Sequence, residues 1–199
     1  MLVITNHADS TNLRTRKGVF LTSRVHPGEN MASYLMENCI KILTGPSLLA
    51  KVLRDNFVFY VVPMLNIDGV IIGNYRCNLS AVDLNRQWSE PSKKLHPTIF
   101  HTKQMLRKMK EERDVFLYCD FHGHNRKKNI FICKPFFLKN SDGCPNKDNS
   151  RRELIFPMFM QRNCEVFSMK DSLFQIQKDR ESCARVSFFP IKNFQDRII

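Results

Sequence analysis

A histidine and a glutamate three residues apart follow directly on an apolar stretch of the sequence. The segment RVHPGE spans residues 24–29, so His26 and Glu29 come just after the mostly apolar run Val19–Val25. Such a pair can offer two zinc ligands from one turn, and a distant histidine would complete a frequent catalytic set of two His and one Glu. The plainer alternative is a polar turn that happens to contain a histidine, because the pair alone is a weak signal.

A second group of polar residues lies at the end of another apolar run. Asp120 belongs to the run Val115–Phe121, and His122 and His124 follow it. Either imidazole could provide the third ligand, and both could equally be ordinary loop histidines. The two segments together indicate a zinc site more strongly than either does alone.

Two arginines and an asparagine lie in the polar stretch between these segments. Arg76 and the pair Asn85-Arg86 fall within NIDGVIIGNYRCNLSAVDLNRQW. A guanidinium group binds a carboxylate through two parallel hydrogen bonds, and a neighbouring amide can add another. This chemistry would recognise a carboxylate. Either arginine could instead form a structural ion pair with Asp68 or Asp83.

The elements that must position these residues alternate between strand and helix signals. Short runs rich in β-branched and aromatic residues predict strands, whereas apolar residues at three- and four-residue spacing predict helices. The predicted strands are Val19–Val25, Phe57–Leu65, Val115–Phe121, Ile130–Cys133 and Arg185–Phe189. The predicted helices are residues 30–44, 46–54, 98–113 and about 152–163, and residues 66–97 and 139–152 are predicted to be irregular.

This order of elements predicts an α/β fold with a mixed, largely parallel central sheet flanked by helices. The 199 residues suffice for one domain with a buried core. In open sheets of this kind, sites form beyond the carboxyl ends of strands. We therefore expect the segment of His26 and Glu29 to lie close to that of His122.

The apolar stretches and the cysteines of the sequence indicate in which cellular compartment the protein is located. The longest apolar stretches, such as Phe57–Leu65, are too short to cross a bilayer, and no basic-then-apolar signal segment opens the sequence. The cysteines are odd in number, scattered and without a Cys-x-x-Cys pair, which favours reduced thiols and a cytoplasmic location. They are Cys39, Cys77, Cys119, Cys133, Cys144, Cys164 and Cys183.

The net charge of +12 favours a polyanionic partner. Lysines and arginines cluster at Arg14–Lys17, Lys103–Lys110, Arg126–Lys128 and Arg151–Arg152. No ribonucleoprotein motif, paired Cys/His finger or basic heptad region accompanies these clusters, so acidic polypeptide is favoured over nucleic acid. The alternative is that the charge serves solubility alone.

The motifs taken together resemble a known family. HPGE, NxDGV, GNYRC, DLNRQW, LHPTIFH and DFHGHNRKKN occur in this order. The set is similar to the M14 zinc carboxypeptidases, and more narrowly to the cytosolic branch that trims glutamates from tubulin tails. The similarity runs from about Val19 to Val186.

The resemblance assigns roles to the residues found above. It implies that His26, Glu29 and His122 bind one zinc ion per chain, and it selects His122 over His124. It implies that Arg76, Asn85 and Arg86 hold the terminal carboxylate of the substrate and polarise the scissile carbonyl. The implied partners are acidic polypeptide tails such as those of tubulin, with neither nucleic acid nor membrane, in the cytoplasm and in association with the cytoskeleton.

The sequence departs from the family pattern near residue 199. The family's general base is a glutamate in a segment like SYTxE that follows a CARV strand. Here SCARVSFF spans residues 182–189, and PIKNFQDRII follows, with Asp196 as its only acidic residue. We therefore expect residues 1–199 to be a single, incomplete catalytic domain whose C-terminal part and general base are missing.

Three functions are compatible with these observations. The first is a zinc metallocarboxypeptidase that removes C-terminal residues, glutamate above all, from acidic protein tails. The second is an inactive fragment that binds zinc and carboxylates. The third is a zinc amidohydrolase of acylated acidic amino acids, since such deacylases share the zinc triad.

Overall fold

The computed structural model describes residues 1–9, 12–133, 154–174 and 182–187. Its central element is a four-stranded sheet in the order β1-β3-β2-β4. The strands are β1 (Leu2–Ile4), β2 (Lys17–Ser23), β3 (Phe57–Val62) and β4 (Val115–Phe121). Strand β2 pairs in parallel with both β3 and β4, and β1 pairs antiparallel with β3. The predicted mixed, largely parallel sheet is thus confirmed.

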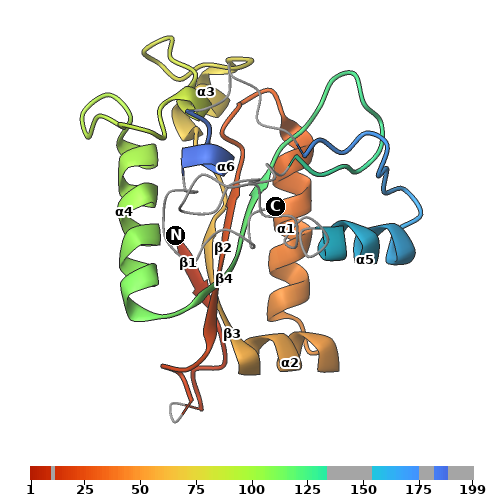
Figure 1. The fold of residues 1–199 in the computed structure, drawn as a ribbon. Coiled ribbons are helices and arrows are strands. Elements are labelled where there is room, and N and C mark those ends of the chain that lie inside the picture. Colours follow the sequence, from red (N-terminus) through yellow and green to blue (C-terminus); the bar gives the residue numbers. More distant parts are fainter. Residues whose placement is uncertain (10–11, 134–153, 175–181, 188–199) are drawn as a thin grey trace, which may run out of the picture.

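Helices cover both faces of this sheet (Figure 1). They are α1 (Asn30–Thr44), α2 (Leu48–Asn56), α3 (Ile67–Ile72), α4 (Pro97–Glu112), α5 (Ile155–Asn163) and α6 (Ala184–Ser187), with a 3-10 turn η1 (Leu84–Arg86). Helix α4 lies on one side of the strands and α1 on the other. No helix within the described ranges is both long enough and apolar enough to span a bilayer.

Alternation along β2 explains the two faces. Successive side chains of a strand point to opposite sides of its sheet. Phe20 therefore packs into the cluster that contains Leu106 of α4, whereas Val19 and Leu21 pack into the cluster that contains Met36 of α1. Both layers are apolar, so β2 is buried on its two faces. Polar functional residues can therefore collect beyond the ends of the strand.

Several predicted boundaries match the structure. Helix α1 has the predicted bounds, α4 begins one residue earlier than predicted, and β4 coincides with the predicted strand. Strand β2 ends at Ser23, two residues before the predicted end, because Arg24 adopts a left-handed conformation with φ of 57°. The region 66–97 is largely irregular, as expected, but it contains α3 and η1.

Two strand predictions are wrong in the described residues. Residues 130–133 contribute only isolated bridges, Ile130 with Phe167 and Cys133 with Leu173. The predicted last strand is instead helical over Ala184–Ser187, where a short apolar run does not distinguish strand from helix. The end of that prediction, the loop predicted at 139–152 and Asp196 lie outside the described residues.

Candidate metal centre

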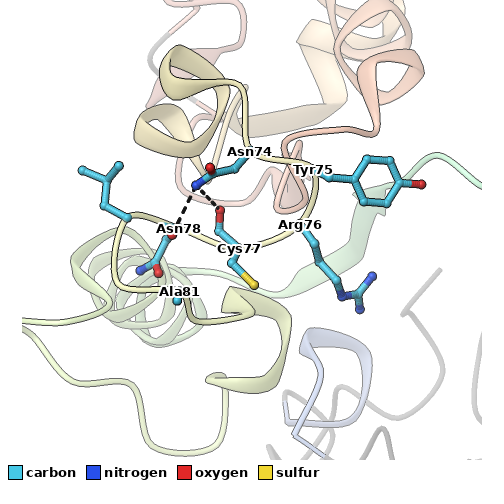
Figure 2. Close-up of a pocket in the computed structure, with 7 residues that line it drawn as sticks. Asn74, Tyr75, Arg76, Cys77, Asn78 and Ala81 are labelled. Carbon is cyan, nitrogen blue, oxygen red and sulfur yellow. Dashed lines mark hydrogen bonds between the residues drawn. The ribbon is translucent and has the colours of Figure 1, made fainter.

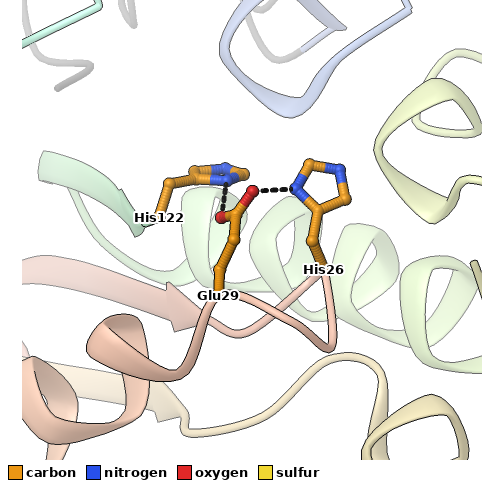
Figure 3. Close-up of side chains that lie close together, drawn as sticks. All are labelled: His26, Glu29 and His122. Atoms are coloured by element: carbon orange, nitrogen blue, oxygen red, sulfur yellow. Dashed lines mark hydrogen bonds and ion pairs between the residues drawn. The ribbon is translucent and has the colours of Figure 1, made fainter. Parts of the chain in front are cut away.

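The site forms where β2 and β4 end side by side. Thr22 of β2 is paired with Asp120 of β4, so the residues after the two strands emerge next to each other. Figure 3 shows His26 and His122 on either side of the Glu29 carboxylate. This confirms the expectation that the two segments meet.

The three side chains converge on one small region. The Nδ1 atom of His26 lies 2.7 Å from Oε1 of Glu29, and Nδ1 of His122 lies 2.9 Å from Oε2. One potential ligand atom from each residue lies within 4.8 Å of the others. Two imidazole nitrogens and a carboxylate are a donor set that zinc uses in catalytic sites, so the residues present fit this metal.

A second carboxylate holds the far side of each imidazole. Nε2 of His26 is 3.2 Å from Oδ1 of Asp83, and Nε2 of His122 is 2.8 Å from Oδ2 of Asp120. Both rings therefore turn Nδ1 toward Glu29. Carboxylates that hydrogen-bond the outer nitrogen of a ligating histidine fix its orientation and raise its basicity.

The charges of the cluster support one another. Burial raises the pKa of Glu29, but hydrogen bonds from His122 and His26 outweigh burial and hold that pKa well below its usual range. Burial lowers the pKa of His122, but Asp120 and Glu29 outweigh burial and raise it to about 10. Acidic and basic groups at this point thus stabilise each other's charged forms.

The turn that carries His26 and Glu29 is fastened to the segment after β3. The Nδ2 group of Asn66 donates to the carbonyl of Val25 at 3.2 Å, and the backbone N–H of Asn66 donates to the carbonyl of Arg24 at 3.2 Å. The N–H of Gly28 donates to the carbonyl of Tyr75 at 2.8 Å. Segments distant in sequence therefore set the direction in which the turn points.

Gly28 has no room for a side chain. A Cβ atom there would lie 2.6 Å from the ring of Tyr75 and 2.8 Å from its carbonyl oxygen. We predict that Gly28→Ala lowers the free energy of unfolding by about 1–3 kcal/mol, as overpacking does. It should also weaken metal binding, because the turn between His26 and Glu29 must shift. Chemical denaturation of the metal-free protein and zinc titration measure the two effects.

Gly73→Ala is the matched control. Gly73 has a φ of 86°, and a Cβ atom added there would meet no other atom within 4 Å, so the change introduces backbone strain of about 1–2 kcal/mol without a collision. We expect it to lower stability and leave zinc affinity unchanged. Weaker zinc binding in both variants would mean that general destabilisation, not the turn, sets the affinity.

His124 does not belong to the cluster. Its Nδ1 atom accepts hydrogen bonds from the backbone N–H groups of Arg126 at 3.1 Å and Lys127 at 3.0 Å. Its ring meets the Phe131 ring edge-on, with 5.4 Å between centroids. Spacing alone could not choose between His122 and His124, whereas the structure brings His122 to Glu29.

Asp83 connects the cluster of His26, Glu29 and His122 to Arg76. Besides its contact with His26, Asp83 accepts hydrogen bonds from Nε of Arg76 at 2.9 Å and from the backbone N–H of Asn85 at 2.9 Å. The structural ion pair considered as an alternative for Arg76 is therefore present. Sequence reasoning named Asp83 only as a possible ion-pair partner and missed its contact with His26. No signal in a single sequence links these distant positions.

Asn85 and Arg86 lie in η1, directly after Asp83. Asn85 is buried, and its Oδ1 atom accepts from the N–H of Ala184 at 3.2 Å. The guanidinium of Arg86 donates to the carbonyl of Asn85 at 3.0 Å and to Sγ of Cys183 at 3.1 Å. Both residues thus follow Asp83 along the chain. Their side-chain hydrogen bonds run to the carbonyl of Asn85 and to residues 183–184, rather than to the histidines of the cluster.

Arg76 stands on a loop that also lines a pocket. The pocket has a volume of about 390 Å³ and is lined by Asn74, Tyr75, Arg76, Cys77, Asn78, Leu79 and Ala81. Figure 2 shows the Nδ2 group of Asn74 donating to the carbonyls of Cys77 and Asn78, which closes the loop on itself. The Arg76 side chain extends away from Asn78 and stays partly exposed.

Comparisons of sequence agree with this geometry. The family described as zinc carboxypeptidase matches residues 1–151, which include every residue of the cluster. Cytosolic carboxypeptidase 3 of Bos taurus is 45% identical over 187 residues, covering 94% of this chain and 18% of its own length. Cytosolic carboxypeptidase 2 of Homo sapiens is 42% identical over 192 residues, covering 94% and 20%. The chain thus spans about a fifth of the length of these relatives.

Comparisons of structure agree on the fold. A metallo-carboxypeptidase from Burkholderia cenocepacia is 23% identical, with a TM-score of 0.75 over 94% of this chain and 47% of its own. A metallo-carboxypeptidase from Pseudomonas aeruginosa, in complex with (2-guanidinoethylmercapto)succinic acid, is 23% identical, with a TM-score of 0.74 over 98% and 48%. The architecture, the converging histidines and glutamate, and the sequence matches lead to one conclusion: this chain belongs to the zinc carboxypeptidase family.

Proposed function

We propose that this chain carries the zinc centre and the terminal-carboxylate site of a cytoplasmic metallocarboxypeptidase. Its substrates would be acidic protein tails such as those of tubulin, from which it removes C-terminal residues, glutamate above all. The observation that carries the proposal is the convergence of His26, Glu29 and His122 at the ends of β2 and β4. Family membership supports the reaction class.

The donor set suits a single zinc ion per chain. Nδ1 of His26, Nδ1 of His122 and the Glu29 carboxylate would hold it. When bound, zinc polarises a carbonyl group and lowers the pKa of water. The chain's own contribution is to hold the two imidazoles with Nδ1 facing Glu29, through Asp83 and Asp120.

Zinc affinity is expected to rise with pH. Protons compete with metal for the Nδ1 lone pairs, and the pKa of His122 is raised to about 10. Binding at neutral pH must therefore release a proton from His122, so the apparent affinity should increase from pH 6 to pH 8. Competition with a chelator of known pH dependence measures this trend. An affinity that stays constant across the range would contradict a site made of these histidines.

The proposed carboxylate site comprises Arg76, Asn85 and Arg86. Asp83 engages Nε and Nη2 of Arg76, and the side chain is still 45% exposed. A guanidinium has five donors, so an arginine anchored on one edge can bind a substrate oxygen with another. Because Asp83 contacts both Arg76 and His26, it would keep Arg76 at a fixed distance from His26.

Arg86→Ala is expected to weaken the binding of a glutamate-ending peptide about tenfold or more. A hydrogen bond to a charged group contributes about 1.5–3 kcal/mol, and the variant removes the charged donor. Calorimetric titration of the zinc-loaded protein measures the loss. Arg162→Ala, at an exposed position of α5 outside the four basic clusters, is the control and should bind normally. Equal binding of the same peptide with an amidated C-terminus would show that no carboxylate is recognised.

The distribution of charge supports an acidic substrate. The net charge is +12, and the exposed Arg126 and Lys128 follow the His122 segment by only a few residues. A positive field beside a cleft raises the local concentration of an acidic peptide. The cysteines of the described residues are free thiols, which fits the proposed cytoplasmic location.

An inactive zinc- and carboxylate-binding module is the second function we retain. The structure places the carboxylates of Glu29, Asp83 and Asp120 at the cluster, and each is engaged by a histidine. None of the three is therefore free to serve as the general base. Binding and hydrolysis must be assayed separately to decide between the two functions.

A further inference from the structure

A line of hydrogen bonds runs from the buried interior of the sheet to His122. The hydroxyl of Tyr118 is 3.0 Å from Oγ1 of Thr22, and Thr22 donates to Oδ1 of Asp120 at 2.7 Å. The other oxygen of Asp120, Oδ2, is 2.8 Å from Nε2 of His122. The residues come from the paired strands β2 and β4, and the line ends on a proposed zinc ligand.

The direction of these hydrogen bonds follows from the donors available. A carboxylate accepts hydrogen bonds and donates none. The single hydroxyl proton of Thr22 therefore points to Asp120, so the Thr22 oxygen accepts from the Tyr118 hydroxyl. By the same rule, Nε2 of His122 must carry a proton to bond Oδ2. The remaining ring nitrogen, Nδ1, faces the Glu29 carboxylate and by the same rule carries a proton when no metal is bound, so this is the proton that a metal ion would displace.

Burial and strand pairing of Asp120 fix the direction of these hydrogen bonds. Thr22 and Tyr118 are fully buried, and the Asp120 side chain is only 8% exposed. Thr22 and Asp120 are also direct partners in the parallel ladder of β2 and β4. Backbone pairing thus fixes the distance between the Thr22 hydroxyl and the carboxylate, and little water can replace Thr22 as the donor.

The outer carboxylate of His26 is held differently. Asp83 divides its two oxygens among His26, Arg76 and the N–H of Asn85, and it stands in the irregular region before η1. Asp120 instead belongs to a strand of the sheet and has one buried hydroxyl behind it. Of the two outer carboxylates, the one that contacts His122 is therefore the more deeply buried, with 8% of its side chain exposed against 18% for Asp83.

We propose that Asp120 is a positioning residue for the metal centre and that Thr22 orients its carboxylate. Asp120 keeps the proton of His122 on Nε2 and turns Nδ1 toward the metal, while the Thr22 hydroxyl holds Asp120 in the rotamer that does so. The inference rests on the proposed zinc site. It adds two residues that are neither among the proposed metal ligands nor in the proposed carboxylate site.

Zinc affinity in single variants tests the proposal. Loss of a partner of this kind typically weakens metal binding by about 10–100-fold, so we expect that range for Asp120→Ala. Thr22→Val replaces the hydroxyl with a methyl group of similar size and should also weaken binding, by less than Asp120→Ala does. Thr22→Ser keeps the hydroxyl and should restore normal affinity. Chelator competition supplies the dissociation constants without any assay of activity.

Two controls separate positioning from a general loss of structure. Thr102→Val makes the same change at a buried threonine of α4 and should leave zinc affinity unchanged. Nitrogen NMR of the zinc-loaded protein should show His122 bound through Nδ1 and protonated at Nε2 in the unmodified protein. A second population with the opposite arrangement should appear in Asp120→Ala. If Asp120→Ala does not fold, the Thr22→Val and Thr22→Ser pair decides the question.

The outcomes separate this inference from the proposed function. An unmodified protein that binds no zinc would overturn both. Normal zinc binding with equal affinity in Asp120→Ala would overturn the positioning role and leave the zinc site standing. An equal loss in Thr22→Val and Thr102→Val would also overturn it, because a weakened fold would then explain both.

Discussion

Replacing His26 by alanine is expected to abolish stoichiometric zinc binding, and replacing His124 by alanine is expected to leave it intact. His26 contributes one of the three donors that lie within 4.8 Å of one another. His124 instead accepts two backbone hydrogen bonds and packs against Phe131. Loss of a direct ligand must cost more than the roughly 10–100-fold that an outer partner contributes.

Metal analysis of purified protein measures the difference between the two variants. We expect one zinc per chain in the unmodified protein and in His124→Ala, and a substoichiometric amount in His26→Ala and His122→Ala. His124→Ala should lose a little thermal stability, since the N–H groups of Arg126 and Lys127 lose their acceptor. Equal zinc loss in His26→Ala and His124→Ala would place the site elsewhere.

The contrast between these two histidines shows how far the sequence alone could go. The pairing of His26 with Glu29 was predictable because both lie in one short turn after an apolar run. The third ligand did not follow from spacing, because His122 and His124 both follow the same apolar run, and only the resemblance to the family selected His122. Only the ladder between β2 and β4, which sets Thr22 opposite Asp120, determines which ring reaches Glu29.

The same limit explains what the sequence missed in the fold. The strands β2, β3 and β4 carry long apolar runs that predict them, but β1 is three residues long and has no periodicity to detect. The early end of β2 depends on the left-handed conformation of Arg24, which hydrogen bonds to Pro27 and Ser33 stabilise. Strand β1 and the early end of β2 both depend on contacts made in the folded chain, so the local sequence pattern does not predict them.

The role of Asp83 was also beyond local pattern. It could be named as a partner for Arg76 because the two are close in sequence. Its bond to His26 joins residues that are 57 positions apart. In the structure, Asp83 therefore connects residues of the two predicted sites, His26 of the metal site with Arg76 and Asn85 of the carboxylate site.

Peptide hydrolysis by a polypeptide of residues 1–199 is expected to be about 10²–10⁴-fold slower than hydrolysis by a version extended through an SYTxE-like segment. Attack by water on a peptide must move a proton to the leaving amine, and a positioned carboxylate contributes this factor. The carboxylates at the cluster already form hydrogen bonds: Glu29 with His26 and His122, and Asp120 with His122 and Thr22. Asp83 is likewise held by His26 and Arg76.

The comparison requires that both polypeptides carry the same zinc and bind the same substrate. We would extend residues 1–199 with an SYTxE-like segment, measure zinc content in each polypeptide, and assay both on a peptide with a polyglutamate tail. Slow turnover with normal zinc and normal peptide affinity would support the binding module for residues 1–199 and the enzyme for the extended chain. Matching turnover would mean that a base lies within residues 1–199. Asp196→Asn would then be the first variant to make, because Asp196 is the only acidic residue after Phe189.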